Sequence, residues 1–119
     1  MAWEVDFTEE FNAWWNTLTI EEQRALGSRI SRLRVYGTAL SRKYSKRVRV
    51  RNGLEMYELR AQSEGRPLRA LYAFDPRMTV IVLLGGDKTG DSDFYPRNIP
   101  KAYDLYDAHV ARLEREGLV

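Results

Sequence analysis

The sequence contains no cysteine, which excludes disulfides and thiolate metal sites. It has one histidine, His109, so a Cys–His pair is impossible and a His-based triad finds no partner around it. We expect His109 to lie at the surface or at its boundary. No apolar run approaches the roughly 20 residues needed to span a bilayer, and the acidic N-terminus lacks the basic start of a signal peptide. We therefore expect a cytoplasmic protein with no metal, cofactor or membrane partner.

Acidic residues are missing from a long internal segment. Between Gln23 and Leu54 there is no Asp or Glu, and ten of the 19 basic residues lie there. The net charge of +2 conceals this asymmetry. An uninterrupted basic third indicates a polyanionic partner, and nucleic acid is the leading candidate. The alternative is a solvated helix face followed by a charged edge strand, which would resist aggregation.

The chain has 119 residues, of which 44% are hydrophobic, enough to bury one core without covalent cross-links. We expect a single domain over residues 1–119. Three apolar runs, Met56–Ala61, Leu68–Phe74 and Thr79–Leu84, are separated by Gly- and Pro-containing gaps. This pattern predicts a three-stranded antiparallel meander.

The flanking segments complete the predicted architecture. Trp3–Phe7 alternates as a strand, and Phe11, Trp14, Trp15 and Leu18 have the spacing of one helix face, which favours core packing of the tryptophans. Thr19 begins a capping box for a second helix that ends near Gly37.

The remaining segments are a strand and a helix. Lys46–Arg51 alternates as an edge strand, and Asn52-Gly53 predicts a hairpin to the next strand. Pro96–Pro100 opens a last helix, with Asn98 as a possible cap. The fold class is therefore α+β, a twisted antiparallel sheet with two N-terminal helices on one side and a C-terminal helix.

The segment 85–90, GGDKTG, has the wrong glycine spacing for a phosphate-binding loop, and Asp87 would repel phosphate. Asp87, Asp91 and Asp93 lack the spacing and the closing Glu of a calcium loop, so we expect them to stiffen the loop. The chemistry left is that of Arg, Lys and Tyr. It suits RNA cleavage by the substrate's own 2′-hydroxyl, in which cations stabilise the phosphorane and a positioned group moves the proton.

The residues ELR at 58–60, RALYAFDP at 69–76 and LLGGDKTG at 83–90, followed by Phe94-Tyr95, occur in this order. The stretch resembles the RelE/HigB/ParE superfamily of bacterial toxins, most closely its phage-derived HigB-like branch. The resemblance implies a RelE-like fold and cleavage of mRNA, typically in the ribosomal A site. It also implies a small antitoxin protein as partner, often a helix-turn-helix DNA binder in this branch.

The resemblance assigns the candidate catalytic residues, which are Arg60, Arg69, Lys88 and Tyr95. It leaves the general base open, because Tyr57 and Glu58 stand where related toxins carry lysines. Lys43, Lys46 or Arg47 could replace that lysine in space. We predict an RNA-binding surface from the basic segment, formed by Lys43, Lys46, Arg47, Arg49 and Arg51.

Two structural alternatives accompany these assignments. Arg60 could pair with Glu58 or Asp87, and Tyr57 could pack under a helix. The leading function is the toxin of a type II toxin–antitoxin pair, an mRNA endonuclease that acts on translating ribosomes. The alternatives are a ParE-like toxin that inhibits DNA gyrase without cleaving RNA, and a catalytically silent relative.

Overall fold

The computed structural model describes residues 2–119, which form five strands, three α-helices and one short 3-10 helix. Their bounds in chain order are β1 Val5–Phe7, α1 Glu9–Trp15, α2 Ile20–Tyr36, η1 Gly37–Ala39, β2 Ser45–Arg51, β3 Leu54–Ser63, β4 Arg66–Phe74, β5 Val80–Asp87 and α3 Phe94–Arg115. In this range no helix is long and apolar enough to cross a membrane.

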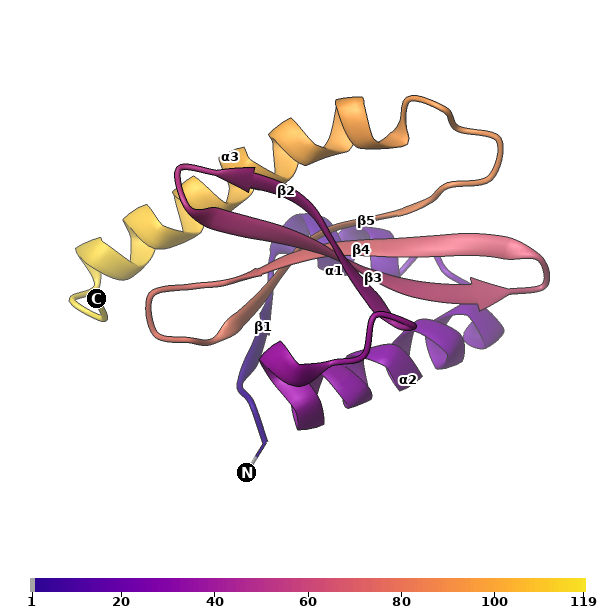
Figure 1. The fold of residues 1–119 in the computed structure, drawn as a ribbon, viewed down its shortest axis with the longest axis horizontal. Coiled ribbons are helices and arrows are strands. Elements are labelled where there is room, and N and C mark those ends of the chain that lie inside the picture. Colours follow the sequence, from indigo (N-terminus) through magenta and orange to yellow (C-terminus); the bar gives the residue numbers. More distant parts are fainter. Residues whose placement is uncertain (1) are drawn as a thin grey trace.

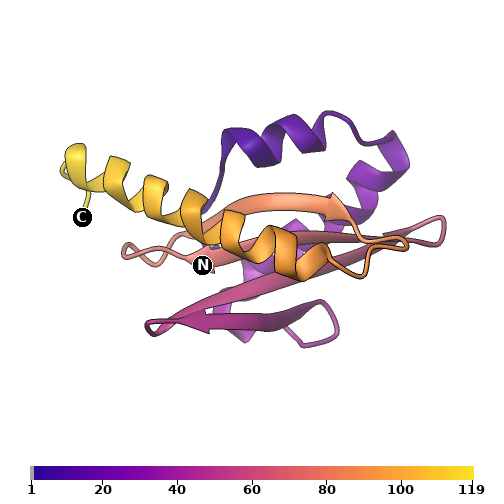
Figure 2. The same cartoon turned by 90° about the horizontal axis from the view of Figure 1, so that it is seen from above.

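The strands form one twisted sheet in the order β1-β5-β4-β3-β2 (Figure 1). The helices α1 and α2 pack on one face and α3 lies along the other, so the sheet is the middle of three layers (Figures 1 and 2). The predicted α+β class is therefore confirmed. It differs in one detail, because β1 pairs with β5 in parallel and the sheet is mixed.

The predicted meander β3-β4-β5 and the β2–β3 hairpin are both present. Asn52 and Gly53 have φ angles of 50° and 82°, the positive pair that a tight two-residue hairpin turn requires. A bulge between Arg47 and Arg49 shifts the register of β2, which is a common feature of edge strands.

Each face of the sheet carries its own apolar cluster. On one face, Phe11 of α1 and Leu26 and Leu33 of α2 are buried in the cluster. Trp14 and Trp15 of α1 pack against the same cluster and are partly buried, as their spacing predicts. On the opposite face Ile99, Ala102 and Tyr103 of α3 cover β3, β4 and β5. The predicted capping box of α2 is present, with Thr19 and Glu22 exchanging hydrogen bonds.

Two predictions in the C-terminal third are wrong. The last helix begins at Phe94, so Asn98 is inside it and its side-chain amide donates to the Phe94 carbonyl oxygen. His109 is buried, because α3 turns it toward Asp75, whose carboxylate lies 2.9 Å from His109 Nε2.

Candidate functional site

Glu58 lies at the centre of a group of polar side chains on the α3 face of the sheet. Strand β3 alternates, so Met56, Glu58 and Arg60 point to one face, while Tyr57 and Leu59 point to the other. The Glu58 side chain has no exposed surface. A carboxylate is buried this completely only when charged or polar partners surround it.

Those partners are three of the four predicted catalytic residues. Arg60 Nε donates to Glu58 Oε1 over 2.9 Å, and the Tyr95 hydroxyl donates to Oε2 over 2.6 Å. Arg69 Nε lies 3.6 Å from the same Oε2. The pairing of Arg60 with Glu58, rather than with Asp87, is thus confirmed.

The sheet register explains why an acid is needed at this position. Arg60 of β3 and Arg69 of β4 are direct cross-strand partners. Like charges directly opposite each other destabilise a sheet. Glu58, two residues before Arg60 on the same face, contacts both guanidinium groups and offsets that repulsion.

Gly85 and Gly86 of β5 allow α1 and α3 to approach the sheet closely, and this approach positions Tyr95. A Cβ on Gly86 would lie 2.7 Å from a ring carbon of Phe94, and one on Gly85 would lie 2.1 Å from Trp14. Successive residues of a strand face opposite sides, so the pair lets α1 approach one face and α3 the other. Phe94 then sits on the sheet, and Tyr95 beside it reaches Glu58.

The fourth predicted residue, Lys88, follows the end of β5. Its Nζ lies 4.7 Å from the centre of the Tyr95 ring, a cation–π contact. The structure thus brings together Glu58, Arg60, Arg69, Lys88 and Tyr95, which we call the Glu58 cluster. It contains three cations and one carboxylate.

Arg69 has the least satisfied side chain of this cluster. Its Nη1 donates to the Leu68 carbonyl oxygen over 3.0 Å, but its buried Nε is the one side-chain atom without a hydrogen-bond partner among the buried polar atoms of residues 2–119. Glu58 Oε2 lies 3.6 Å from this Nε, just beyond hydrogen-bond distance. Arg60 and Lys88 remain partly exposed beside it, so the cluster can hold a phosphate group by charge and by hydrogen bonds.

The loop between β5 and α3 is stiffened by its acids, as expected. The Asp87 carboxylate accepts from the hydroxyl and the backbone N–H of Thr89, and these bonds lower the pKa of Asp87. Asp91 accepts from Arg97, which lowers its pKa, and from the backbone N–H of Asp93. The loop therefore presents Lys88 to the cluster from a fixed backbone.

The predicted RNA-binding residues do not form one face. Lys46 is opposite Glu58 in the ladder, at the exposed edge. Arg47 instead pairs with Glu55, and Arg51 pairs with Asp107 and stacks on Tyr103. Arg49 is exposed on the edge strand, and Lys43 lies in the loop before it. The edge strand thus presents its cations to both sides of the sheet.

Sequence analysis named Glu58 only as a structural partner of Arg60, and it left both Glu58 and Tyr44 out of the predicted site. Glu58 could have been found from its i, i+2 spacing to Arg60 on a strand, which places both on one face. Tyr44 had no signal, because only folding brings Arg29 and Arg32 of α2 to within 4.6 Å and 4.5 Å of its ring. These cations extend the basic surface from β2 onto α2.

The fold and the Glu58 cluster define a small α+β protein with a cationic site on the α3 face of the sheet. The family model "Phage derived protein Gp49-like (DUF891)" matches residues 13–107. The chain therefore belongs to this phage-derived Gp49-like family, which is HigB-like.

Two relatives from Mycobacterium tuberculosis (strain H37Rv) carry toxin names. The chain is 36% identical over 90 residues to "Putative toxin HigB3", which covers 75% of this chain and 77% of the relative. It is 34% identical over 116 residues to "Putative toxin HigB2", which covers 96% of this chain. The chain spans 57% of the length of HigB2.

Proposed function

We propose that this protein is the toxin of a type II toxin–antitoxin pair and that it cleaves mRNA at the Glu58 cluster. The observation that carries the proposal is the convergence of Arg60, Arg69 and Tyr95 on one buried carboxylate, with Lys88 against the Tyr95 ring. Family membership and the names of the two relatives support the toxin role. A cognate antitoxin protein, cytoplasmic location and action on translating ribosomes belong to the same proposal.

In this proposal the scissile phosphate lies between Arg60 and Arg69. Their outward N–H groups bind its non-bridging oxygens and stabilise the charge that develops in the phosphorane. The 2′-oxygen attacks phosphorus, and the bond from phosphorus to the 5′-oxygen breaks. The products are a 2′,3′-cyclic phosphate and a free 5′-hydroxyl.

Two protons must move during this step. The 2′-hydroxyl proton passes to the Tyr95 oxygen while the Tyr95 proton passes to Glu58, along the existing 2.6 Å hydrogen bond. The Lys88 ammonium, next to the Tyr95 ring, donates a proton to the leaving 5′-oxygen. In this proposal Glu58 acts as the general base through Tyr95.

The test is expression of the wild type and of Arg69→Ala and Tyr95→Phe without antitoxin, followed by mapping of transcript ends. We expect growth arrest and new transcript ends with the wild type and with neither of these two variants. Removing one preorganised donor of this kind costs on the order of 100-fold or more in rate. Tyr103→Phe is the matched control, because its hydroxyl on the same helix bonds the Leu54 carbonyl oxygen outside the cluster.

Full toxicity of Arg69→Ala would contradict the proposal. Growth arrest with intact mRNA and damaged DNA would point instead to the gyrase-inhibiting alternative. A catalytically silent relative is the second candidate, and one observation favours it: Glu58 already takes the hydrogen bonds of Arg60 Nε and the Tyr95 hydroxyl. Absence of both arrest and transcript cleavage in the wild type would select that candidate.

A further inference from the structure

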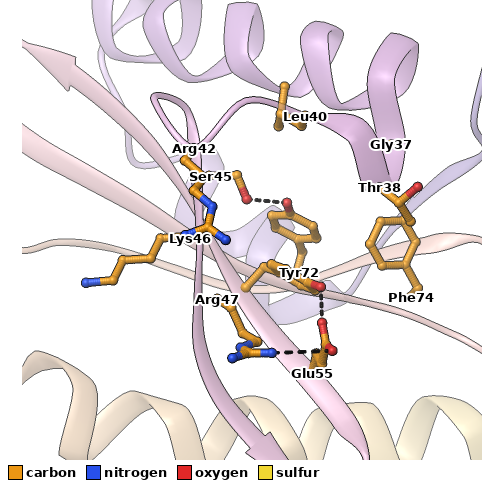
Figure 3. A pocket seen from close by; sticks show the side chains of 11 residues that line it. Gly37, Thr38, Leu40, Arg42, Ser45, Lys46, Arg47, Glu55, Tyr72 and Phe74 are labelled. Atoms are coloured by element: carbon orange, nitrogen blue, oxygen red, sulfur yellow. Dashed lines mark hydrogen bonds and ion pairs between the residues drawn. The ribbon is translucent and has the colours of Figure 1, made fainter.

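The face of the sheet opposite the Glu58 cluster contains a cavity of about 410 Å³. It lies between the end of α2 with η1, the start of β2, and strands β3 and β4 (Figure 3). Its volume falls in the range of about 300–1,000 Å³ that is typical of small-molecule sites. The Glu58 cluster has no part in this cavity, although Lys46 and Arg47 of the predicted RNA-binding surface line it.

Aromatic rings form the apolar part of its wall. Tyr57 and Tyr72 stack with ring centres 5.4 Å apart and planes 18° apart, and Phe74 meets both rings edge-on. Tyr72 is buried, whereas Tyr57 and Phe74 keep exposed surface toward the cavity they line. A flat ring in a partly open wall is a platform on which another flat ring can stack.

Polar groups surround this platform. The hydroxyls of Ser45 and Tyr72 lie 2.5 Å apart within the wall. Burial raises the pKa of the Tyr72 hydroxyl to about 12, and burial with the hydrogen bond to Glu55 raises that of Tyr57 to about 12. Both phenols are therefore neutral at physiological pH and would not repel an anion.

The charged residues on the rim are mostly cations. Arg42 lies beside Ser45, and Arg47 lies beside Glu55, 3.6 Å away, while Lys46 extends outward (Figure 3). Arg42 is exposed and forms no ion pair within residues 2–119. Glu55 is the one carboxylate that lines the cavity in this part of the chain. The balance of charge thus favours an anion.

We propose that this cavity is a nucleotide-binding site, in which a base stacks on Tyr57 and a phosphate is held by Arg42 and Arg47. A flat aromatic wall with arginines at its rim matches the two parts of a nucleotide, since every base has a stacking face and guanidinium groups fit phosphate. The ligand is a nucleotide of a single-stranded RNA or a free nucleotide, which present the same chemistry. The proposal does not depend on RNA cleavage, because the Glu58 cluster lies on the opposite face.

The test is titration of the full chain with AMP and with a short 2′-O-methyl oligoribonucleotide, which cannot be cleaved by 2′-hydroxyl attack. Binding is followed by calorimetry and by NMR signals of the tyrosine rings. Binding of AMP identifies a site for free nucleotides, and binding of the oligonucleotide alone identifies one for RNA strands. Either result supports the proposal, provided that the Tyr57 ring signals shift.

Two variants assign the binding to the cavity. Arg42→Gln removes a cation from an exposed position, so the fold should persist, and we expect affinity to fall about tenfold. Tyr57→Leu removes the stacking platform and should cost roughly tenfold. Arg24→Gln is the charge-matched control on the exposed start of α2. It should bind like the wild type.

Failure of AMP and the oligonucleotide to bind would overturn the proposal, as would equal affinities for the wild type and Arg42→Gln. Loss of antitoxin binding in both cavity variants with nucleotide binding unchanged would also overturn it, and would assign the cavity to an acidic protein segment. If the wild type cleaved no RNA, the nucleotide-binding proposal would still stand. The two proposals can therefore fail separately.

Discussion

At the scale of single residues, the fully buried Glu58 affects both the stability of the sheet and the arrangement of the candidate site. It faces two arginines that are direct cross-strand partners and a tyrosine from the start of α3. Removing one member of a buried charge group leaves the others without compensation, which costs far more than losing a surface pair. Glu58 therefore supports both the sheet and the candidate site.

We expect Glu58→Ala to lower the free energy of unfolding by about 3 kcal/mol or more, because Arg60 and Arg69 lose the carboxylate between them. Urea unfolding at neutral pH measures the change. Asp107→Ala is the control, since its pair with Arg51 joins side chains that are 58% and 41% exposed. Such a pair is worth about 1 kcal/mol at most. Equal effects of the two substitutions would contradict the role of Glu58.

Four members of the Glu58 cluster were predicted from the sequence, but Glu58 at its centre was not. Arg60, Arg69, Lys88 and Tyr95 were named from family resemblance, and the structure brings them together. Glu58 stands where related toxins carry a lysine, so the comparison with the family gave it no role in the site. Its burial depends on the register of β3 with β4 and on the position of α3, which residue types alone do not specify.

At the scale of elements, the glycine pair in β5 sets how closely α1 and α3 approach the sheet. We expect Gly86→Ala to lower the free energy of unfolding by about 1–3 kcal/mol, because its Cβ would overlap the Phe94 ring. Thermal unfolding checks this, and the additional change Phe94→Leu should restore part of the loss. Stability unchanged by Gly86→Ala would show that α3 is free to shift.

A helical glycine provides the matched control. A Cβ on Gly27 of α2 would meet Trp15 at 3.6 Å, an ordinary contact. Since alanine is the better helix former, Gly27→Ala should stabilise the protein by about 0.5–1 kcal/mol. The two Gly→Ala changes are thus expected to have opposite signs.

The turn between β4 and β5 is joined to α3 through Asp75. This buried carboxylate accepts from the Arg77 side chain, from the backbone N–H groups of Arg77 and Thr79, and contacts His109. Burial opposes its ionisation, but these hydrogen bonds outweigh burial, so the pKa of Asp75 lies below its usual value. Folding is therefore favoured by the ionised form.

The direction of the pH dependence follows from that pKa. The stabilisation is fully present above the unfolded-state pKa of about 4 and is lost as pH falls through the lower folded pKa. We expect Asp75→Asn to be less stable than the wild type at pH 7, with the difference shrinking below about pH 4. Urea unfolding across this range measures it. Asp104→Asn, at an exposed position of α3, is the control, and a pH-independent difference for Asp75→Asn would contradict the account.

Elements with strong local signals were predicted well. Asn52-Gly53, the Thr19 capping box and the alternation of β3, β4 and β5 all act within a few residues. The start of α3 was misplaced because Pro96 lies in its first turn, where a missing N–H does no harm. The parallel pairing of β1 with β5 joins residues far apart in the chain, and no local pattern encodes it.

At the scale of the whole molecule, the acid-free segment 23–54 holds ten of the 19 basic residues. We expect replacement of Lys43, Lys46 and Arg47 with Ala to flatten the slope of log affinity for single-stranded RNA against log salt by roughly two units, at about 0.7 per phosphate contact. Filter binding over a salt series measures the slope. Replacement of Lys101 and Arg115, exposed on α3, should leave it unchanged. The opposite pattern would place the RNA on α3.

The most direct test of the central claim is cleavage of a defined RNA by the purified protein, with and without ribosomes. One substrate is all-ribose, and its partner carries a single 2′-deoxynucleotide on the 5′ side of the cleaved bond. The account predicts cleavage of the first substrate to a 2′,3′-cyclic phosphate, none of the second, and a rate lower by about 100-fold or more for Arg69→Ala. Equal cleavage of both substrates, or of the first by wild type and Arg69→Ala alike, would contradict it.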